Sequence, residues 1–465
     1  MRADSGETLQ ASDGAGLRLE DGNRVGVVGA GPAGSFFAYF LLEMADRVGL
    51  DLRVEIVESR DFLQPSPQGC NMCGGIVSES LVQNLAAEGI NLPATVIQRG
   101  IDSYHLHMDV GSVRIETPLH EMRIGAVHRG SGPRDVQLHD WESFDHHLLQ
   151  KAIGKGARVV RERADGLEIE AGRPVLKLRG GGREHYDLLA VAVGVNSPIV
   201  QAFEAAGIGY TTPAVTRTFI REYHLGRDLI SRTIGSSMHV FLLTIPRLEF
   251  AAVIPKGDYV TVCLLGEDID NELVKAFLDA PEVRRCFPPD WQPDLKSCQC
   301  MPHINVRGPD RPYSDRILFV GDCGVTRLYK DGIGAAYRTA KAAARTAVFE
   351  GISADAFHRC YGPVCGTIAA DNVMGRLAFV FTRVVRHMRV ARKAILRMTV
   401  AEQRRPGESR RMSGILWDMF SGSAPYKDIF LRMLQPACVA GFAWAFARSL
   451  WPAAAASGDR RETLS

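Results

Sequence analysis

A glycine-rich turn between an apolar strand-like run and an apolar helical segment constrains this chain more than any other feature. Residues 24–28 form a short β-branched run, as expected for a buried strand. Residues 35–44 have a mostly apolar, helical character, and residues 52–57 alternate as a second strand that ends at Glu58. The turn itself consists of Gly29, Ala30, Gly31, Pro32, Ala33 and Gly34. This order of strand, glycines, helix, strand and acid predicts a Rossmann-like unit that binds a dinucleotide.

Each conserved feature of such a turn has a physical reason, and this chain supplies all of them. Gly29 permits the tight turn, Gly31 lets the backbone approach a pyrophosphate, and Gly34 lets the helix pack close to the sheet. Pro32 and Ala33 begin the helix, whose free N–H groups favour a phosphate. Glu58 stands where an acid accepts hydrogen bonds from a ribose. The turn alone does not separate FAD from NAD.

A second strand-to-helix turn lies far along the chain. Residues 316–320 form a buried strand that runs into Gly321 and Asp322, and a helix follows to residue 349 after the sequence Gly332, Ile333 and Gly334. This pattern places a carboxylate beside a helix N-terminus. In a flavoprotein, Asp322 would bind the ribityl hydroxyls, and the helix dipole would stabilise negative charge on the reduced flavin.

Two further segments complete the pattern. A helix begins near residue 141 and is followed by a strand at 157–160, and another buried strand, 188–193, ends at Gly194. The four segments in this order resemble the flavoprotein superfamily of aromatic hydroxylases and geranylgeranyl reductases, over residues 23–351. The resemblance is closest to the geranylgeranyl reductase branch, through two runs: Cys73-Gly74-Gly75, and residues 250–258 with their Pro255-Lys256-Gly257. It implies a two-domain fold that binds FAD.

The chain departs from the superfamily at two places. Hydroxylases of the superfamily carry Asp-Gly where this chain has Gly194-Val195-Asn196. The proline expected after Gly-Asp is missing, and Tyr329 and Lys330 lie near its place. Both departures disfavour a hydroxylase that uses NAD(P)H, and neither removes the features that predict FAD.

Cysteines near the expected flavin are the candidate catalytic residues. In the resembled family the Cys-Gly-Gly loop lies beside the isoalloxazine ring, which points to Cys73 and to Cys70. Three interpretations stay open: cysteines that line the site, a redox pair that exchanges electrons with the flavin, or a metal or iron–sulfur site that also uses Cys298 and Cys300. Since the last spacing is not a standard one, we assign no metal ligand. Arg129 is expected near the flavin or its phosphates.

The rest of the chain predicts an apolar substrate and a helical C-terminal region. Residues 211–270 form apolar strands, which favour a hydrophobic substrate. No acidic residue occurs between Asp371 and Glu402, and a basic amphipathic helix is expected there. Its basic face would include Arg383, Arg386, Arg389, Lys393 and Arg397, opposite an apolar face with Leu377, Val380, Phe381, Val384, Met388, Ala391, Ile395 and Met398. This helix either rests on an anionic membrane or docks on the catalytic domains with its basic face in solvent.

Bulk properties set the cellular context and the domain boundaries. A net charge of +2 gives no reason to expect nucleic-acid binding, and ten cysteines in 465 residues without an export signal indicate a cytoplasmic protein. No apolar stretch is expected to span a membrane, so any membrane contact would be peripheral, at the inner face. The fold class expected is α/β. Its parts are a disordered tail (1–23), an FAD-binding domain (24–200 and 312–360) with an insertion around 100–130, a β-sheet substrate domain (201–311) and a helical region (361–465).

The sequence therefore predicts an FAD-dependent oxidoreductase. The favoured activity is reduction of carbon–carbon double bonds in an isoprenoid or other lipid-like substrate, by hydride transfer from reduced flavin, with Cys73 or a water molecule supplying the proton. NAD(P)H and an electron-donor protein are the candidate sources of electrons. Two alternatives remain: an electron-transfer flavoprotein that links a protein partner to a quinone or cluster, and a flavin monooxygenase.

Overall fold

A parallel sheet organises the domain that the sequence predicts to bind FAD, which is called the FAD-binding domain on that prediction. The structure, a computed structural model, describes residues 17–64, 73–118, 124–133, 141–294, 298–405 and 410–450. Five parallel strands lie in the order β20-β12-β1-β2-β8, with β19 (Tyr313–Ser314) antiparallel at the edge. The five are β1 (Arg24–Val28), β2 (Arg53–Val57), β8 (Arg158–Val160), β12 (Leu188–Val191) and β20 (Ile317–Phe319). The strands expected from the sequence around the glycine-rich turn are confirmed.

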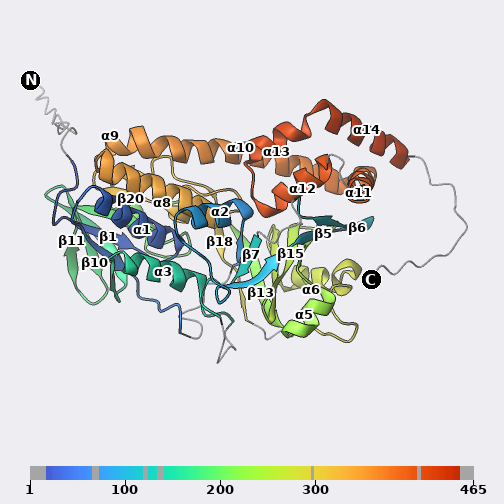
Figure 1. Cartoon of the computed structure of the whole chain (residues 1–465), viewed down its shortest axis with the longest axis horizontal. Coiled ribbons are helices and arrows are strands. Elements are labelled where there is room, and N and C mark those ends of the chain that lie inside the picture. Colours follow the sequence, from blue (N-terminus) through green and yellow to red (C-terminus); the bar gives the residue numbers. More distant parts are fainter. Residues whose placement is uncertain are drawn as a thin grey trace, which may run out of the picture.

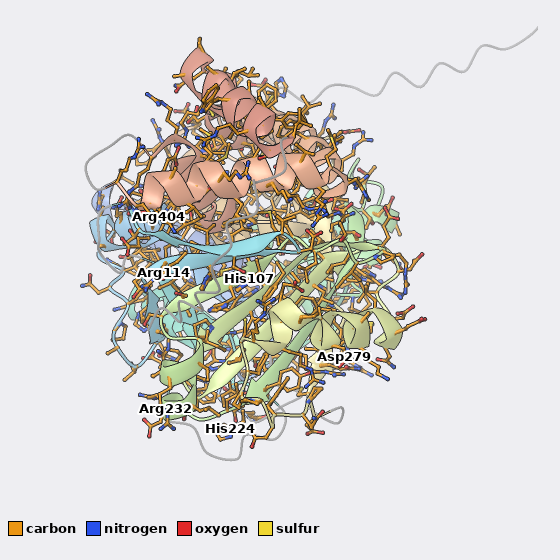
Figure 2. The ribbon with its side chains drawn as sticks, turned by 90° about the vertical axis from the view of Figure 1, so that its right-hand side faces the viewer. His107, Arg114, His224, Arg232, Asp279 and Arg404 are labelled. Atoms are coloured by element: carbon orange, nitrogen blue, oxygen red, sulfur yellow. The ribbon has the colours of Figure 1, made fainter. Side chains whose placement is uncertain are left out.

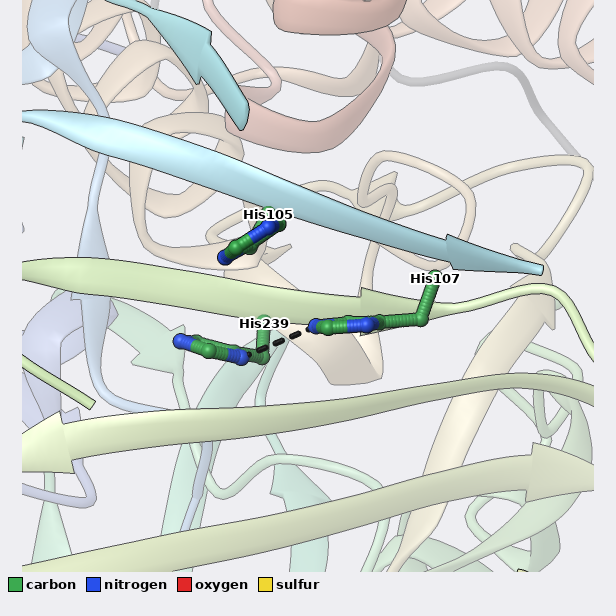
Figure 3. Close-up of side chains that lie close together, drawn as sticks. All are labelled: His105, His107 and His239. Carbon is green, nitrogen blue, oxygen red and sulfur yellow. Dashed lines mark hydrogen bonds between the residues drawn. The ribbon is translucent and has the colours of Figure 1, made fainter. Parts of the chain in front are cut away.

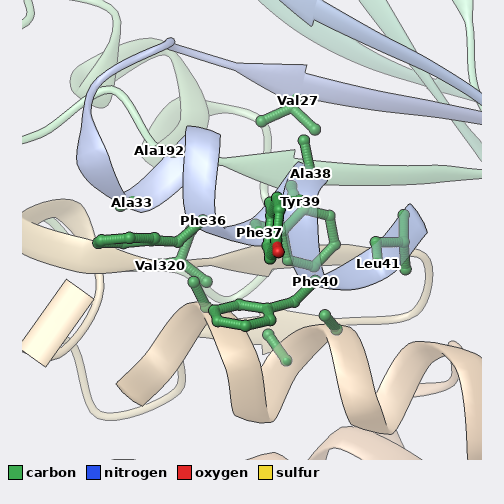
Figure 4. Packing of buried hydrophobic residues seen from close by; sticks show 14 of the residues in the cluster. Val27, Ala33, Phe36, Phe37, Ala38, Tyr39, Phe40, Leu41, Ala192 and Val320 are labelled. Carbon is green, nitrogen blue, oxygen red and sulfur yellow. The ribbon is translucent and has the colours of Figure 1, made fainter. Parts of the chain in front are cut away.

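Helices cover one face of this sheet and a small antiparallel sheet covers the other. On the first face α1 (Pro32–Arg47) packs between α3 (Phe144–Gly154) and α8 (Gly332–Phe349). Phe36, Phe37 and Phe40 of α1 are buried there (Figure 4). The other face packs against β9 (Ala164–Glu170), β10 (Arg173–Leu178), β11 (Arg183–His185) and α4 (Val200–Ala205). Alternate residues of β1 face the two layers, which explains why this strand is apolar throughout.

The substrate domain is built on an eight-stranded sheet. Its order is β17-β13-β16-β15-β14-β5-β6, and β18 pairs with β13. These strands are β5 (Ser103–Met108), β6 (Gly111–Glu116), β13 (Ala214–His224), β14 (Ser237–Phe241), β15 (Leu248–Lys256), β16 (Tyr259–Gly266), β17 (Gln299–Cys300) and β18 (His303–Arg307). Because β5 and β6 belong to this sheet, residues 103–116 join the substrate domain although they precede most of it in sequence.

Smaller elements connect the two domains. A three-stranded sheet consists of β3 (Ile76–Val77), β7 (Ile124–Val127) and β4 (Ile97–Ile101), and α2 (Glu79–Ala87) contacts it.

One face of the eight-stranded sheet packs against α5 (Arg227–Thr233), α6 (Asn271–Asp279) and α7 (Pro281–Arg284). Within the segment expected to be a tail, Leu19 is buried and the Leu17 carbonyl accepts the Ile352 N–H.

The C-terminal helices cover the opposite face of the eight-stranded sheet. They are α10 (Gly362–His387), α11 (Arg389–Gln403), α12 (Arg411–Ser421), α13 (Tyr426–Met433) and α14 (Pro436–Leu450). Before them, α9 (Ala354–Ala356) leads into the π-helical turn Phe357–Tyr361, which packs instead against α8 in the first domain. Figure 1 shows α10 along the top of the molecule, reaching from the FAD-binding domain toward the other C-terminal helices. The α/β fold with a β-sheet domain and a helical C-terminal region agrees with the sequence-based prediction.

The single amphipathic helix predicted between Asp371 and Glu402 is wrong. Met388 leaves the helical conformation, at φ −103° and ψ 101°, and separates α10 from α11. The break turns α11 onto β6 and α14, where Arg392 forms an ion pair with Asp109 at 2.7 Å. Tertiary contacts therefore end a helical pattern that continues in the sequence.

The expected basic face is solvated only in part, because Arg383, Arg389 and Arg397 are exposed and Arg386 is not. Arg386 is buried, Arg383 pairs with Glu249, and Arg397 donates to the Ser449 hydroxyl at 3.1 Å. Arg386 thus turns into the protein, whereas Arg383 and Arg397 make these contacts from exposed positions. The exposed side of α10 also carries apolar residues, namely Val373, Leu377, Val380, Phe381, Val384 and the adjoining Met388.

The C-terminal helices also hold the loop that follows Gly321 and Asp322. The Asn372 side chain accepts the Leu328 N–H and donates to the Thr326 carbonyl, each at 2.8 Å. The Tyr426 hydroxyl donates to the Leu328 carbonyl at 2.6 Å. The helical region is therefore part of the support of the FAD-binding domain.

Candidate functional site

Two glycines of the first turn are required by packing. Gly29 has φ +101°, and a Cβ there would lie 2.7 Å from the Ala192 carbonyl oxygen. A Cβ on Gly34 would lie 1.9 Å from the Gly29 carbonyl oxygen. No other residue fits at either position without moving the backbone, so β1, β12 and α1 approach one another only because these residues are glycine.

Gly31 is different, because its surroundings are open. A Cβ there would meet only the Arg129 Nη2 within 4 Å, at 3.7 Å. Gly31 is the N-cap of α1, Pro32 follows it, and no side chain caps the helix. The first turn of α1 thus presents free N–H groups beside a cation, an arrangement that fits a pyrophosphate.

Glu58 stabilises this turn through hydrogen bonds. Its carboxylate accepts the Ala30 N–H at 3.1 Å and the Arg60 N–H at 2.9 Å. Glu58 is buried at the end of β2. Its contact with a ribose stays a prediction.

The second turn lies directly against the first. Gly321 has φ +69°, and a Cβ there would lie 2.6 Å from the Ala33 Cβ. This contact joins the end of β20 to the start of α1. Asp322 therefore lies at the same edge of the parallel sheet as the glycine-rich turn.

Asp322 lies beside the N-terminus of α8. A Cβ on Gly332 would lie 3.8 Å from the Asp322 carboxylate and 3.7 Å from the Thr326 hydroxyl. Thr326 Oγ1 is buried and has no hydrogen-bond partner in the described part of the chain. Ile333 follows Gly332 in the first turn of α8, and a Cβ on Gly334 would lie 2.1 Å from the Asp331 carboxylate. A carboxylate, a hydroxyl and a helix N-terminus thus meet, which fits the polar groups of a flavin.

Arg129 lies next to the first turn and within electrostatic reach of the second. Its guanidinium donates to both carboxylate oxygens of Asp145, at 3.0 and 2.9 Å, and Asp145 is fully buried. Burial opposes the charge of Arg129, but Asp145, Cys73 and Asp322 together raise the pKa of Arg129 above its ordinary value. Arg129 is therefore a permanent cation within electrostatic reach of the Cys-Gly-Gly loop and of Asp322, and next to Gly31.

A buried ion pair anchors the Cys-Gly-Gly loop. Lys256 Nζ donates to the Cys73 carbonyl at 3.1 Å and to the Glu222 carboxylate at 2.9 Å. Burial opposes both charges, but their attraction raises the pKa of Lys256 and lowers the pKa of Glu222. Gly75 has φ +67°, and a Cβ there would lie 2.1 Å from the Val127 carbonyl oxygen. Glu222 was missed by the sequence analysis, because its partners are distant in the chain.

The cysteine hypotheses are tested only in part. Cys70 lies outside the described residues. Cys73 accepts the Gly75 N–H at 3.1 Å, and burial raises the pKa of the neighbouring Cys263 to about 12, which keeps that thiol protonated. Among the described residues, Cys73, Cys298 and Cys300 do not form a group that could hold a metal ion. The redox pair stays a prediction.

The two departures from the superfamily have structural correlates. Asn196, in place of the Asp-Gly of the hydroxylases, exchanges hydrogen bonds with the backbone of His303 at 2.9 and 2.8 Å.

Lys330 lies over the rings of Phe250 and Phe420, at 4.5 and 5.1 Å from their centroids. Burial, with the charge of Arg327, lowers the pKa of Lys330 to about 7. A group with this pKa can give or take a proton at neutral pH.

Known structures share this architecture. No protein-family model matches the chain, and no curated protein matches it in sequence. A geranylgeranyl bacteriochlorophyll reductase-like protein from Thermoplasma acidophilum is 16% identical, with a TM-score of 0.61 over 92% of this chain and 100% of that chain. A flavoprotein/dehydrogenase from Cytophaga hutchinsonii is 13% identical, with a TM-score of 0.60 over 92% of this chain and 99% of that chain.

The chain has the fold of the FAD-binding flavoprotein oxidoreductases. A third neighbour, 2-methyl-3-hydroxypyridine-5-carboxylic acid oxygenase, is 16% identical, with a TM-score of 0.55 over 79% of this chain and 93% of that chain. Since the neighbours include reductase-like proteins and an oxygenase, the fold does not select the reaction.

The open side of Gly31 predicts a variant that folds but binds the cofactor weakly. Gly31→Ala adds a Cβ that meets only Arg129, so the apoprotein should keep its melting temperature. The same methyl group would hinder close approach of a pyrophosphate, and FAD affinity should fall by about tenfold or more. Fluorescence titration of apoprotein with FAD measures this. Gly154→Ala, whose Cβ would meet nothing within 4 Å, is the control. Unchanged affinity in Gly31→Ala would contradict the assignment.

The lowered pKa of Lys330 predicts a pH-dependent contribution to stability. Between pH 7 and the ordinary value of 10.5, the unfolded chain holds a proton on this amine that the folded chain has lost. Stability from Lys330 therefore rises with pH across this window, and is lowest below pH 7. Relative to wild type, the melting temperature of Lys330→Met should fall by on the order of 2–4 °C as the pH increases from 7 to 10. Lys275→Met, on the exposed side of α6, should show no such trend.

Proposed function

We propose that the protein is an FAD-dependent oxidoreductase. The observation that supports this most directly is that two helix N-termini, one beside Gly31 and one beside Asp322, lie at one sheet edge, with Arg129 next to the first and within electrostatic reach of Asp322. The fold is the one in which such sites hold FAD. Bound FAD would supply the hydride or electron transfer.

The residues of this chain would bind and orient the cofactor. The first turn of α1, with Gly31 and Arg129, would hold the pyrophosphate, and Glu58 would keep the turn in shape. Asp322 and the Thr326 hydroxyl would take polar groups near the start of α8, whose dipole favours negative charge. The Lys256–Glu222 pair would fix the Cys-Gly-Gly loop beside the ring.

The proposed reaction is reduction of a carbon–carbon double bond in an isoprenoid or other lipid-like substrate. Hydride would add to one alkene carbon and a proton to the other, and two electrons from NAD(P)H or a donor protein would restore the reduced flavin. Cys73 and Lys330 are the candidate proton donors, because one is a thiol in the anchored loop and the other is an amine with a pKa of about 7. The likeness to the Thermoplasma acidophilum reductase-like protein supports this reaction.

A flavin monooxygenase is the second candidate, because an oxygenase shares the fold. The electron-transfer hypothesis depends on a Cys70–Cys73 pair, and Cys70 lies outside the described residues.

We also propose peripheral contact with the inner face of a membrane. The apolar side of α10 is exposed, and so are Leu431 and Leu434 at the end of α13 and Trp444 of α14, the last at 67%. The helix Ala354–His387 is long and apolar enough to cross a membrane by length and composition, although the sequence analysis expected no such segment. Its exposed apolar side chains lie along one side, which favours a helix that lies at the surface of a bilayer. Such contact would give access to a lipid substrate.

An anaerobic titration tests the reaction. The holoprotein is titrated with NADPH, NADH and then dithionite while flavin absorbance is followed, and geranylgeranyl lipids in vesicles are then added to the reduced protein. Reoxidation without oxygen, with a product heavier by two hydrogen atoms in mass spectrometry, is expected. If reduced protein is reoxidised only by oxygen, with a hydroxylated product, the monooxygenase is correct and the reductase is excluded.

Vesicle flotation tests the membrane contact. Val380→Asp/Val384→Asp should reduce the fraction bound to anionic vesicles by roughly tenfold, because both side chains leave an apolar environment. Val48→Asp/Ile169→Asp places the same charges on exposed residues of other elements and should bind as wild type does. Absence of wild-type binding, or equal loss in both variants, would reject the surface.

A further inference from the structure

A cluster of histidines lies in the substrate domain, away from the flavin-binding turns. His105 and His107 alternate along β5, so their side chains lie on one face of the sheet. His239, on the parallel neighbour β14, stands opposite His105 in register. The three imidazoles offer ligand nitrogens that all lie within 4.8 Å of one another (Figure 3). Within the described residues, this is the group of His, Cys, Asp and Glu side chains arranged to hold a metal ion.

A thiol lies beside two of the three histidines. Cys286, which follows α7, is buried, and its Sγ lies 3.2 Å from His239 Nδ1 and 3.9 Å from His107 Nε2. His107 Nε2 and His239 Nδ1 are 2.9 Å apart. In a tetrahedral zinc site, with Zn–N near 2.0–2.1 Å and Zn–S near 2.3 Å, neighbouring ligand atoms are ~3.3–3.6 Å apart. Of the three observed distances, 2.9 and 3.2 Å are shorter than this range and 3.9 Å is longer.

The outer nitrogens of two histidines are already held. His107 Nδ1 is 2.9 Å from the Ser112 hydroxyl, and His239 Nε2 is 3.4 Å from the Ile234 carbonyl. Metal-bound histidines usually have such a contact on the nitrogen that does not bind the metal.

The cluster lies on the face of the sheet opposite the Cys-Gly-Gly loop. His239 pairs with Val253, which belongs to the core beneath α6 and α7. The next residue, Ile254, faces the other way and lies 3.5 Å from the Cβ position of Gly74. Figure 2 shows His107 between the C-terminal helices, marked by Arg404, and α6, marked by Asp279. The cluster is therefore separate from the candidate flavin site.

We propose that His105, His107, His239 and Cys286 bind one zinc ion. Three imidazole nitrogens and one thiolate give four protein ligands, and a closed set of four protein ligands is typical of structural zinc. The ion would tie β5 and β14 to the segment after α7, three parts of the substrate domain that are distant in sequence. Its binding would release the Cys286 proton, and no electron transfer is involved.

The first test is the metal content and coordination of wild-type protein. Full-length holoprotein, purified after expression with added zinc, is analysed by mass spectrometry of the metal and by zinc K-edge X-ray absorption. About one zinc per chain, with one sulfur shell near 2.3 Å and nitrogen shells near 2.0 Å, is expected. Protein that holds no zinc, and takes up none from micromolar Zn²⁺, would overturn the proposal whatever the variants do.

Matched variants then locate the site. Cys286→Ser should remove the sulfur shell, and His107→Ala and His239→Ala should each weaken zinc binding by at least about tenfold. Cys360→Ser and His224→Ala change the same residue types elsewhere and should keep both zinc and the sulfur shell. FAD content should stay the same in all five, because the cluster is on the far face of the sheet. A sulfur shell that persists in Cys286→Ser would overturn the assignment.

Discussion

The contact between Gly321 and Ala33 is the constraint on which the rest of the structure depends. A side chain at position 321 would overlap Ala33, so the end of β20 reaches the start of α1 only because this residue is glycine. The contact places Asp322 and the first turn of α8 at the same sheet edge as Gly31. Arg129, held by the buried carboxylate of Asp145, lies next to Gly31 and within electrostatic reach of Asp322. Arg129 and the two helix N-termini would favour a negatively charged dinucleotide at this edge.

Support for this edge comes from regions that are distant in sequence. Asn372 and Tyr426, on C-terminal helices, fix the backbone between Thr326 and Leu328. From the substrate domain, Lys256 reaches the Cys73 carbonyl and is neutralised by Glu222. A buried ion pair costs desolvation energy, and its retention here is consistent with a role in positioning the loop. The helical region thus supports the predicted FAD-binding domain, and its α10 also carries an exposed apolar surface.

Local patterns could be predicted from the sequence, and long-range partners could not. The first strand and helix follow from the β-branched run and the glycines at positions 29, 31 and 34, because those constraints act within one turn of chain. The break at Met388 could not be predicted, since Asp109 and other distant contacts decide where α11 turns. The burial of Arg386 and the pairing of Glu222 with Lys256 could not be predicted either, because they also depend on distant residues. The sequence shows only a His-X-His alternation at 105 and 107 for the histidine cluster, because β14 and the segment after α7 supply the other donors.

The central claim is that the joined turns hold FAD, and the flavin content of the purified protein tests it most directly. The absorption spectrum of the full-length chain is recorded before and after incubation with FAD, and the flavin released by denaturation is identified by chromatography. One FAD per chain, with a bound-flavin spectrum, is the predicted result. A protein that is folded by circular dichroism but binds no flavin, even after FAD is added, would contradict the account.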